Sequence, residues 1–321
     1  MLRTQLTELL EVEHPIILAP MGDVAGGALA AAVSNAGGLG LVGAGYADPV
    51  WLEEQLSLAG TARVGVGFIT FALDERPRTL DVALTRQPPA IQLSFGDPEP
   101  YVARIHDAGA MVICQVQTVA EARAAASVGA DVIVAQGEDS GGHGRPGRGT
   151  FGLVPSVVDA VGPVPVVAAG GIMDGRGLAA ALVLGAGGAT MGTRFYAASE
   201  ALSDPTARSR LVQASGDDTV RTSAFDVVRG PAWPEGHDGR ALSNALTQAW
   251  EREGLEPGEL ADWKVRYRTA RSDDYGVHAL WAGDAVDLVG SIVPAAQIVD
   301  GTVWEASRLL AGHVVDDPGA R

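Results

Sequence analysis

The chain has 321 residues, of which 47% are hydrophobic and 19% charged, so it can bury a sizeable core and is not disordered throughout. Its 39 acidic and 23 basic residues give a formal net charge of −16, which repels phosphodiesters and anionic lipids and argues against nucleic-acid and membrane partners. Cys114 is the single cysteine, which excludes an internal disulfide. The N-terminus lacks the apolar segment of a signal peptide, and no apolar run of membrane-spanning length follows. We therefore expect a cytoplasmic protein.

Short apolar runs recur at regular intervals along the chain and predict eight strands. They read as continuous apolar runs, as expected for strands that are buried on both faces. Between them lie Ala- and Leu-rich segments with helical spacing, several of which end in glycine, the usual residue just beyond a helix. The predicted strands begin near Ile16, Leu39, Val64, Ala90, Met111, Asp131, Pro165 and Ala189.

Eight strands that alternate with helices predict a (β/α)₈ TIM barrel. A doubly wound open sheet is the competing architecture. The even spacing, and the unusual loops late in the chain, favour the closed barrel. We expect the barrel core, with the cofactor site, over residues 1–202.

Two segments break the rhythm. Residues 137–152 form a long loop after the sixth strand, which is either a tolerated surface insertion or a functional loop. Residues 203–275 show no strand–helix period and predict a helical elaboration over the barrel mouth. Residues 276–321 are expected to return to the barrel as two helical segments, GDAVDLVGSI and PAAQIVDGTVWEASRLLAG.

Glycines at the ends of the seventh and eighth predicted strands indicate an anion site. Gly170 and Gly171 end the seventh strand, and Met191, Gly192 and Thr193 end the eighth. Glycine lets backbone N–H groups approach an oxyanion closely, and loops after strands seven and eight often bind phosphate in barrel enzymes. The alternative is a pair of ordinary glycine turns. The two turns together favour a phosphate site.

The loop after the sixth strand carries the candidate catalytic residue. Gln136 ends that strand with an amide that can both donate and accept, which suits the edge of a heterocycle. Gly141 and Gly142 allow a tight turn beside a planar ligand, and His143 follows them. A histidine over a barrel mouth can take a proton near neutral pH. The alternative is a solvated or capping histidine, and the flanking glycines favour the functional interpretation.

The first strand ends in Ala19, Pro20 and Met21. The proline stiffens the strand exit, and the methionine offers a polarizable surface to an aromatic ring. No spacing typical of metal ligands is present, so we expect no dedicated metal site. The short Gly65-Val66-Gly67 segment does not continue into a dinucleotide-binding fingerprint.

Four segments together resemble the nitronate monooxygenase family, formerly called 2-nitropropane dioxygenases. They are APMG at 19–22, AQGEDSGGH at 135–143, AAGGI at 168–172 and MGTRF at 191–195. The similarity runs over most of the chain, and WPEGHDGRALSNAL and WAGDAV in the later part also look like family segments.

The resemblance implies an FMN-containing TIM barrel that oxidises alkyl nitronates or nitroalkanes with O₂ to a carbonyl compound and nitrite. It places the flavin phosphate at Gly171, Gly192 and Thr193. It also places Met21, Gln136 and Gly141 near the isoalloxazine, and His143 as the catalytic base. The expected partners are the small-molecule substrate and O₂, with a homodimer left open.

One residue departs from the family pattern, and two other functions stay open. Many members have an asparagine where this chain has Gly67, which removes a side-chain contact to the flavin. The same superfamily includes an NAD(P)H-dependent flavin enoyl-thioester reductase, enoyl-ACP reductase II. A flavin-binding barrel without turnover is the third alternative.

Overall fold

A computed structural model describes residues 2–312 and shows a closed barrel of parallel strands. Neighbouring strands pair in parallel in the order β1-β9-β8-β6-β5-β4-β3-β2, and a bridge between Ile17 and Leu39 joins the two ends of this order. The predicted TIM barrel is therefore confirmed, and the open sheet is excluded. The strands are β1 Ile16–Leu18, β2 Leu41–Gly43, β3 Gly65–Ile69, β4 Ala90–Ser94, β5 Met111–Val116, β6 Val132–Gln136, β8 Val166–Ala169 and β9 Gly188–Met191.

Helices surround the barrel, and local capping explains where several of them begin. The Asp48 side chain accepts hydrogen bonds from two N–H groups at the start of α3, and Thr118 and Glu121 form a capping box at the start of α7. The helices are α2 Gly27–Asn35, α3 Pro49–Leu58, α4 Thr70–Glu75, α5 Thr79–Leu84, α6 Glu99–Asp107, α7 Val119–Ser127, α8 Thr150–Val161, α9 Gly175–Val183 and α10 Thr193–Tyr196.

The N-terminal helix and the C-terminal helix complete the barrel. Leu6 and Leu10 of α1 Gln5–Leu10 pack into a buried cluster with residues from the strands, including Ile17, Leu41 and Val134. Helix α15 Ala295–Gly312 packs against α9 and α2. The predicted last helical segment is thus confirmed, while residues 313–321 lie outside the described residues. None of the helices within residues 2–312 is long and apolar enough to cross a membrane.

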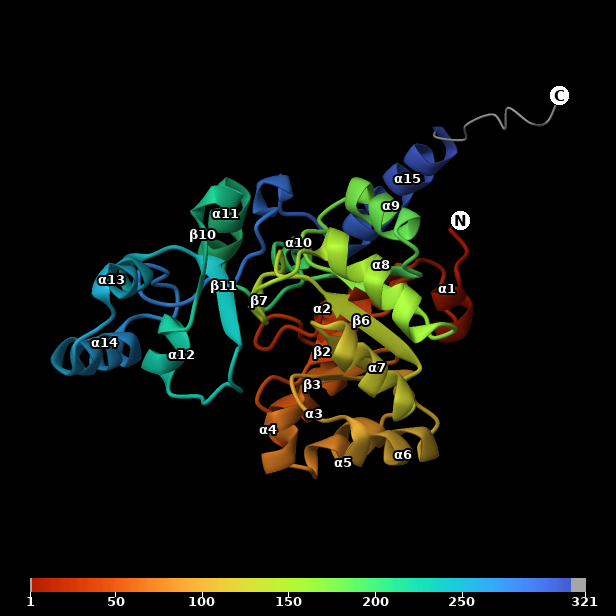
Figure 1. The fold of residues 1–321 in the computed structure, drawn as a ribbon, viewed down its shortest axis with the longest axis horizontal. Coiled ribbons are helices and arrows are strands. Elements are labelled where there is room, and N and C mark those ends of the chain that lie inside the picture. The colour runs from red at the N-terminus through yellow and green to blue at the C-terminus, as the bar shows by residue number, and fades with distance from the viewer. Residues whose placement is uncertain (1, 313–321) are drawn as a thin grey trace.

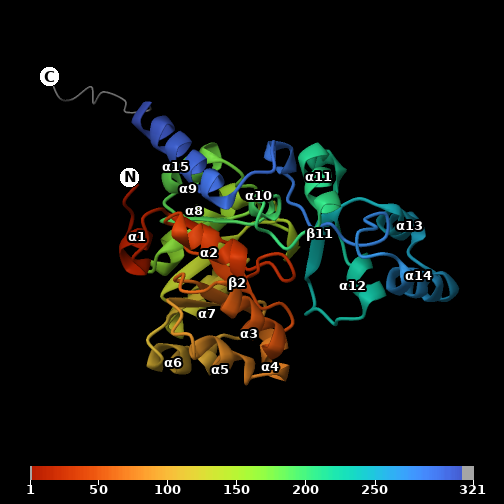
Figure 2. The ribbon, with the colours of Figure 1, turned by 180° about the vertical axis from the view of Figure 1, so that it is seen from behind.

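The elaboration between β9 and α15 lies beside the barrel, with α13 and α14 farthest from it (Figures 1 and 2). It contains the expected helices, and also two strands that the sequence did not predict. These two strands pair antiparallel with each other, and the second of them, β11, also pairs antiparallel with β7 Gly142–Gly144, a short strand in the loop after β6. Its elements are α11 Pro205–Gln213, η1 Gly216–Asp218, β10 Thr219–Thr222, α12 Ala224–Arg229, β11 Asp238–Leu242, α13 Ala245–Glu253 and α14 Pro257–Thr269.

The prediction of a helix over GDAVDLVGSI is wrong, because this segment holds a single 3₁₀ turn, η2 Val286–Leu288. Its glycines and β-branched residues disfavour a longer helix. The start of the segment instead packs on the barrel mouth. The Gly283 N–H donates to Thr193 Oγ1 at 3.0 Å, and the Asp284 N–H donates to the Asp139 carbonyl at 3.2 Å. The domain boundaries at residues 202 and 275 stay predictions.

Candidate active site

A cavity of about 480 Å³ lies at the carboxyl ends of the barrel strands, within the size range of small-molecule sites. Residues after β1, β6, β8 and β9 line it together with side chains from the elaboration. All but one of the residues predicted for the site line this cavity: Ala19, Pro20, Met21, Gln136, Gly141, Gly142, His143, Gly170, Gly171, Gly192 and Thr193.

Met191 is the exception among the predicted residues. Its side chain is fully buried in the core, and it pairs with Leu18 in the barrel register. Its carbonyl accepts a hydrogen bond from the Ala19 N–H at 2.9 Å. Met191 therefore fixes where the chain leaves β1, although its side chain does not face the cavity.

The glycines after β8 form an open backbone turn at the cavity wall. Gly170 and Gly171 have φ of 111° and 68°, in the left-handed region that favours glycine. A Cβ on Gly170 would come within 2.6 Å of Thr150 Oγ1, whereas a Cβ on Gly171 would meet its nearest neighbour, the Asp139 Cβ, at 3.5 Å. There is thus no room for a side chain at Gly170, whereas the backbone at Gly171 is open to the cavity.

Two hydroxyl groups in the cavity wall lack partners within the described chain. Ser140 Oγ and Thr190 Oγ1 are buried, and neither makes a hydrogen bond. Leaving a buried polar group unpaired is unfavourable, so such groups in a cavity indicate a polar ligand. The phosphate, ribityl hydroxyls and ring carbonyls of a flavin offer suitable partners, so the residues present fit this cofactor.

Two carboxylates lie beside the glycine turn. Asp139 accepts a hydrogen bond from the Thr150 N–H. An ideal Cβ on Gly171 would lie 3.9 Å from Asp284 Oδ1. Burial raises the pKa of Asp284 above its ordinary value, and the nearby charge of Asp139 raises it further. The carboxylates of Asp139 and Asp284 therefore repel each other when both are charged.

His143 lies in β7 and is enclosed by aromatic rings. It pairs with Gly239 of β11 in the small antiparallel sheet. Its ring stacks on Trp233 with 3.6 Å between ring centroids and 3° between planes. The ring of Trp281 lies 4.8 Å from it, tilted by 52°. The rigid stack fixes the plane of the imidazole at the cavity.

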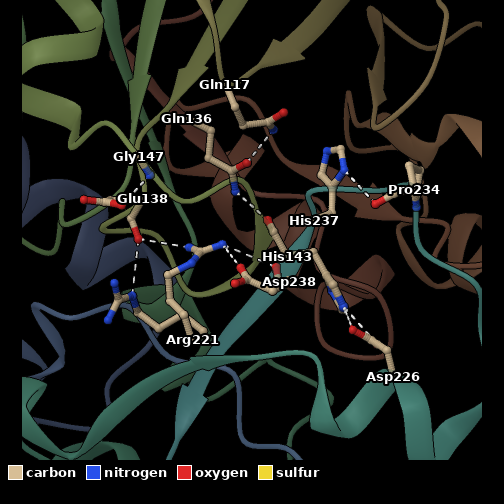
Figure 3. Close-up of polar contacts among 11 residues, drawn as sticks. Gln117, Gln136, Glu138, His143, Gly147, Arg221, Asp226, Pro234, His237 and Asp238 are labelled. Atoms are coloured by element: carbon tan, nitrogen blue, oxygen red, sulfur yellow. Dashed lines mark hydrogen bonds and ion pairs between the residues drawn. The ribbon is translucent and has the colours of Figure 1, made fainter.

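Asp226 of α12 holds the imidazole from the side of the elaboration. His143 Nε2 lies 3.0 Å from Asp226 Oδ1 and 2.9 Å from Oδ2 (Figure 3). Both side chains are buried, at 10% and 7% exposure. Because a carboxylate accepts, Nε2 must carry the proton in the neutral ring, which leaves the Nδ1 lone pair free to accept one.

A chain of glutamine amides positions the loop that carries His143. Gln136 Nε2 donates to the His143 carbonyl at 3.0 Å. Gln136 Oε1 accepts from Gln115 Nε2 at 3.0 Å and from Gln117 Nε2 at 2.7 Å. Gln92 Nε2 lies 3.3 Å from Gln115 Oε1 and extends the chain across the barrel. The amide of Gln136 thus supports the loop, in addition to any contact it makes with a ligand.

Two arginines of the elaboration fasten the same loop. Arg221 Nη1 and Arg240 Nε each donate to the Glu138 carbonyl at 3.2 Å. Arg221 also forms an ion pair with Asp238, and Gly147 N–H donates to Glu138 Oε2 at 2.6 Å (Figure 3). The loop after β6 is therefore an ordered part of the site, and the alternative of a free surface insertion does not hold.

Trp233 connects the elaboration to the opposite rim of the barrel. Its Nε1 donates to the Tyr46 hydroxyl at 3.2 Å, and its ring makes edge contacts at 5.1 Å with Phe71 and Phe95. Trp233 and Trp281 were not singled out as site residues, although both lie in the segments that resemble the family. Asp226 was not predicted as a site residue. It lies 83 residues from His143 in a six-residue helix, and no local sequence signal marks it.

The departure at Gly67 has a steric basis. A Cβ on Gly67 would lie 2.2 Å from the Cβ and 2.4 Å from the Cγ of Pro20. The proline ring therefore occupies the space that a side chain at position 67 would need.

Within residues 2–312, no group of three or more His, Cys, Asp or Glu side chains is arranged to hold a metal ion.

Comparisons with known proteins agree with this fold. The family model described as nitronate monooxygenase matches residues 3–62 and 69–305. Nitronate monooxygenase npaC of Metarhizium robertsii is 38% identical, covering 93% of this chain and 92% of its own length.

Two further relatives carry different names. A (3aS,4S,5R,7aS)-5-hydroxy-7a-methyl-1-oxo-octahydro-1H-indene-4-carboxyl-CoA dehydrogenase of Mycobacterium tuberculosis is 34% identical, covering 98% of this chain and 90% of its own. The structure of FabK from Thermotoga maritima superposes with a TM-score of 0.84 at 34% identity, covering 97% of this chain and 98% of that one. The chain is an oxidoreductase and belongs to the nitronate monooxygenase family, whose enzymes are flavin-dependent.

Proposed function

We propose that the protein oxidises alkyl nitronates, and the nitroalkanes from which they derive, with bound FMN and O₂ to a carbonyl compound and nitrite. The observation that carries this proposal is the buried His143–Asp226 pair at the wall of the large cavity. A fixed imidazole with one ring nitrogen that makes no hydrogen bond suits removal of a proton from a carbon acid.

The cofactor site is assigned to the glycine turns. The backbone at Gly171, Gly192 and Thr193 would hold the FMN phosphate, with Met21 and Gly141 near the ring system. The unpaired hydroxyls of Ser140 and Thr190 add hydrogen-bonding capacity at the same wall. When bound, the flavin supplies the redox chemistry, and the protein supplies binding, orientation and electrostatics.

The proton step belongs to His143. With Nε2–H held by Asp226, the Nδ1 atom accepts the α-proton of a neutral nitroalkane. The carboxylate stabilises the imidazolium that results, and the face of Trp233 stabilises it further by a cation–π contact. The protonated ring then faces an anionic nitronate and holds it in place. Such a base contributes roughly 10²–10⁴-fold to the rate.

A flavin-dependent enoyl-thioester reductase that uses NAD(P)H is the second candidate. It is supported by the similarity to the CoA-thioester dehydrogenase and to FabK, which is as strong as the similarity to nitronate monooxygenases. Anaerobic mixing separates the two functions. Bleaching of the flavin by NADH or NADPH marks the reductase, and oxygen uptake with ethyl nitronate marks the monooxygenase.

The phosphate assignment is tested by Gly171→Asp. The new carboxylate would stand beside Asp139 and Asp284 where the phosphate must bind, so charge repulsion should leave the folded protein colourless. Gly171→Asn is the matched control, because asparagine has the same shape and tolerates positive φ equally well. Flavin absorbance of the purified proteins measures the effect, and a yellow Asp variant would refute the assignment.

The opposed carboxylates predict a pH-dependent stability. The folded-state pKa of Asp284 is raised above its unfolded value of about 3.9. The repulsion lowers the free energy of unfolding. This loss of stability is absent at pH values below the unfolded-state pKa of Asp284 and complete at pH values above its raised folded-state pKa. Asp284→Asn should therefore raise the Tm at pH 8 by roughly 1–3 °C, with a smaller gain at pH 4.5.

Asp287→Asn is the control of opposite sign for this stability measurement. Hydrogen bonds from the Gly216 N–H and from Ser215 lower the pKa of Asp287. Its charge therefore favours folding, and its removal should lower the Tm at pH 8. Equal Tm changes at both pH values for Asp284→Asn would contradict the assigned repulsion.

The proton step is tested by His143→Asn. Activity on neutral nitroalkanes should fall by roughly 10²–10⁴-fold, because the base is lost. Activity on preformed nitronates should fall much less, since their α-proton is already gone, and flavin should be retained. Oxygen uptake with nitroethane and with ethyl nitronate gives the comparison. Equal losses on both substrates would show that His143 does not abstract the proton.

A further inference from the structure

Five side chains at the large cavity contact one another in a closed ring. His143 binds Asp226 and stacks on Trp233. Trp233 in turn donates to the Tyr46 hydroxyl at 3.2 Å. Arg229 closes the ring, since its Cζ lies 5.8 Å from the centroid of the Tyr46 ring and its Nη1 lies 3.9 Å from Asp226 Oδ1. All of them except Asp226 line the cavity, so Arg229 and Tyr46 border the same space as the proposed base.

Arg229, the last residue of α12, has N–H groups without acceptors. Its side chain is only 25% exposed, and its 3.9 Å contact with Asp226 is an ion pair that is too long for a hydrogen bond. No group among residues 2–312 accepts a hydrogen bond from this guanidinium. A guanidinium carries five N–H donors in a planar fork, which matches a planar anion with two oxygens. An arginine that is largely buried with these donors unused indicates an anionic ligand in the cavity.

The Tyr46 hydroxyl has a proton to donate. Because its oxygen accepts the hydrogen bond from Trp233 Nε1, its own proton is available for a second partner. Nothing in the described part of the chain accepts this proton. One hydrogen bond and one ring stack connect the hydroxyl through Trp233 to the imidazole of His143, which fixes the two groups relative to each other. The phenol thus adds a neutral donor beside the cationic donors of Arg229.

We propose that Arg229 and Tyr46 bind the two oxygens of the nitro group, with the reacting carbon next to Nδ1 of His143. This inference rests on the proposed function and adds two substrate-binding residues to it. When His143 takes the α-proton, the electron pair of the C–H bond forms a C=N double bond, and negative charge develops on the two oxygens. Arg229 and Tyr46 bind this charge as it forms, so they stabilise the transition state more than the neutral nitroalkane.

Arg229→Met tests the site through separate effects on kcat and KM, measured by oxygen uptake of the holoenzyme. With neutral nitroethane, kcat should fall by roughly 10²–10³-fold with little change in KM, because the charge forms only in the transition state. With ethyl nitronate, which is already an anion, KM should rise by roughly tenfold or more, because charge-assisted hydrogen bonds are lost. An unchanged KM for ethyl nitronate would overturn the proposal.

Two further arginine variants separate the contact from charge alone. Arg229→Lys keeps a cation near Asp226 but lacks the planar fork, so its KM for ethyl nitronate should stay raised. Arg76 also lines the cavity, but it is exposed at the end of α4. Arg76→Met should therefore leave this KM close to the wild-type value. A wild-type KM in Arg229→Lys, or equal effects of the two methionine variants, would contradict the two-oxygen contact.

Tyr46→Phe removes only the hydroxyl. It should change the same parameters in the same directions by a smaller factor, roughly tenfold, because one hydrogen bond to the developing charge is lost. The ethyl nitronate result is decisive for this residue. If Tyr46 acted only through Trp233 and His143, the proton step on nitroethane would suffer and the preformed nitronate would not. Loss on nitroethane alone would therefore refute direct contact with the nitro oxygens.

Binding of inert anions separates this inference from the proposed function. Acetate and propionate present a planar group with two oxygens, and their binding to the oxidised holoenzyme is followed by the flavin spectrum without turnover. Their Kd should rise by roughly tenfold or more in Arg229→Met and stay unchanged in Arg76→Met. This result supports the two-oxygen site even if no nitronate is consumed. Equal Kd values in wild type and Arg229→Met contradict the site even if ethyl nitronate is oxidised.

Discussion

The hydrogen bond between His143 and Asp226 is the contact on which the organisation of the site depends. It joins the loop after β6 to helix α12, two parts of the chain 83 residues apart. The barrel alone offers a histidine on a glycine-rich loop, with no contact that fixes the orientation of its ring. The elaboration supplies the carboxylate that selects the tautomer and the aromatic faces that fix the ring plane.

Several weaker contacts position the loop that carries His143 so that this hydrogen bond can form. The short β7 is rich in glycine and has little strand propensity of its own, so its pairing with β11 must hold it in an extended conformation. Arg221 and Arg240 bind the carbonyl of Glu138 on one side of the loop, and Gln136 binds the carbonyl of His143 on the other. Contacts from the barrel and from the elaboration thus hold the loop and the imidazole of His143 from both sides.

The sequence predicted the parts of the fold that have a strong local pattern. All eight barrel strands lie where continuous apolar runs predicted them, and His143 and the glycine turns line one cavity because strand ends of a barrel meet at one face. The missed features depend on contacts between distant segments. Asp226 in a short helix, the two strands of the elaboration and the irregular 283–293 segment have no periodicity that marks their partners. Met191 still belongs to β9 and its side chain is buried in the core, so its assignment to the cofactor site stays a prediction.

The central claim, that Asp226 acts through His143, is tested most directly by a double-mutant cycle. The measurement is kcat/KM for nitroethane in flavin-loaded wild type, Asp226→Asn, His143→Asn and the double variant. Asp226→Asn should lower the value by roughly 10–10³-fold in the wild-type background and have almost no effect once His143 is asparagine, because residues that act as a unit are not additive. Losses that multiply in the double variant would show that the two residues act independently and would contradict the account.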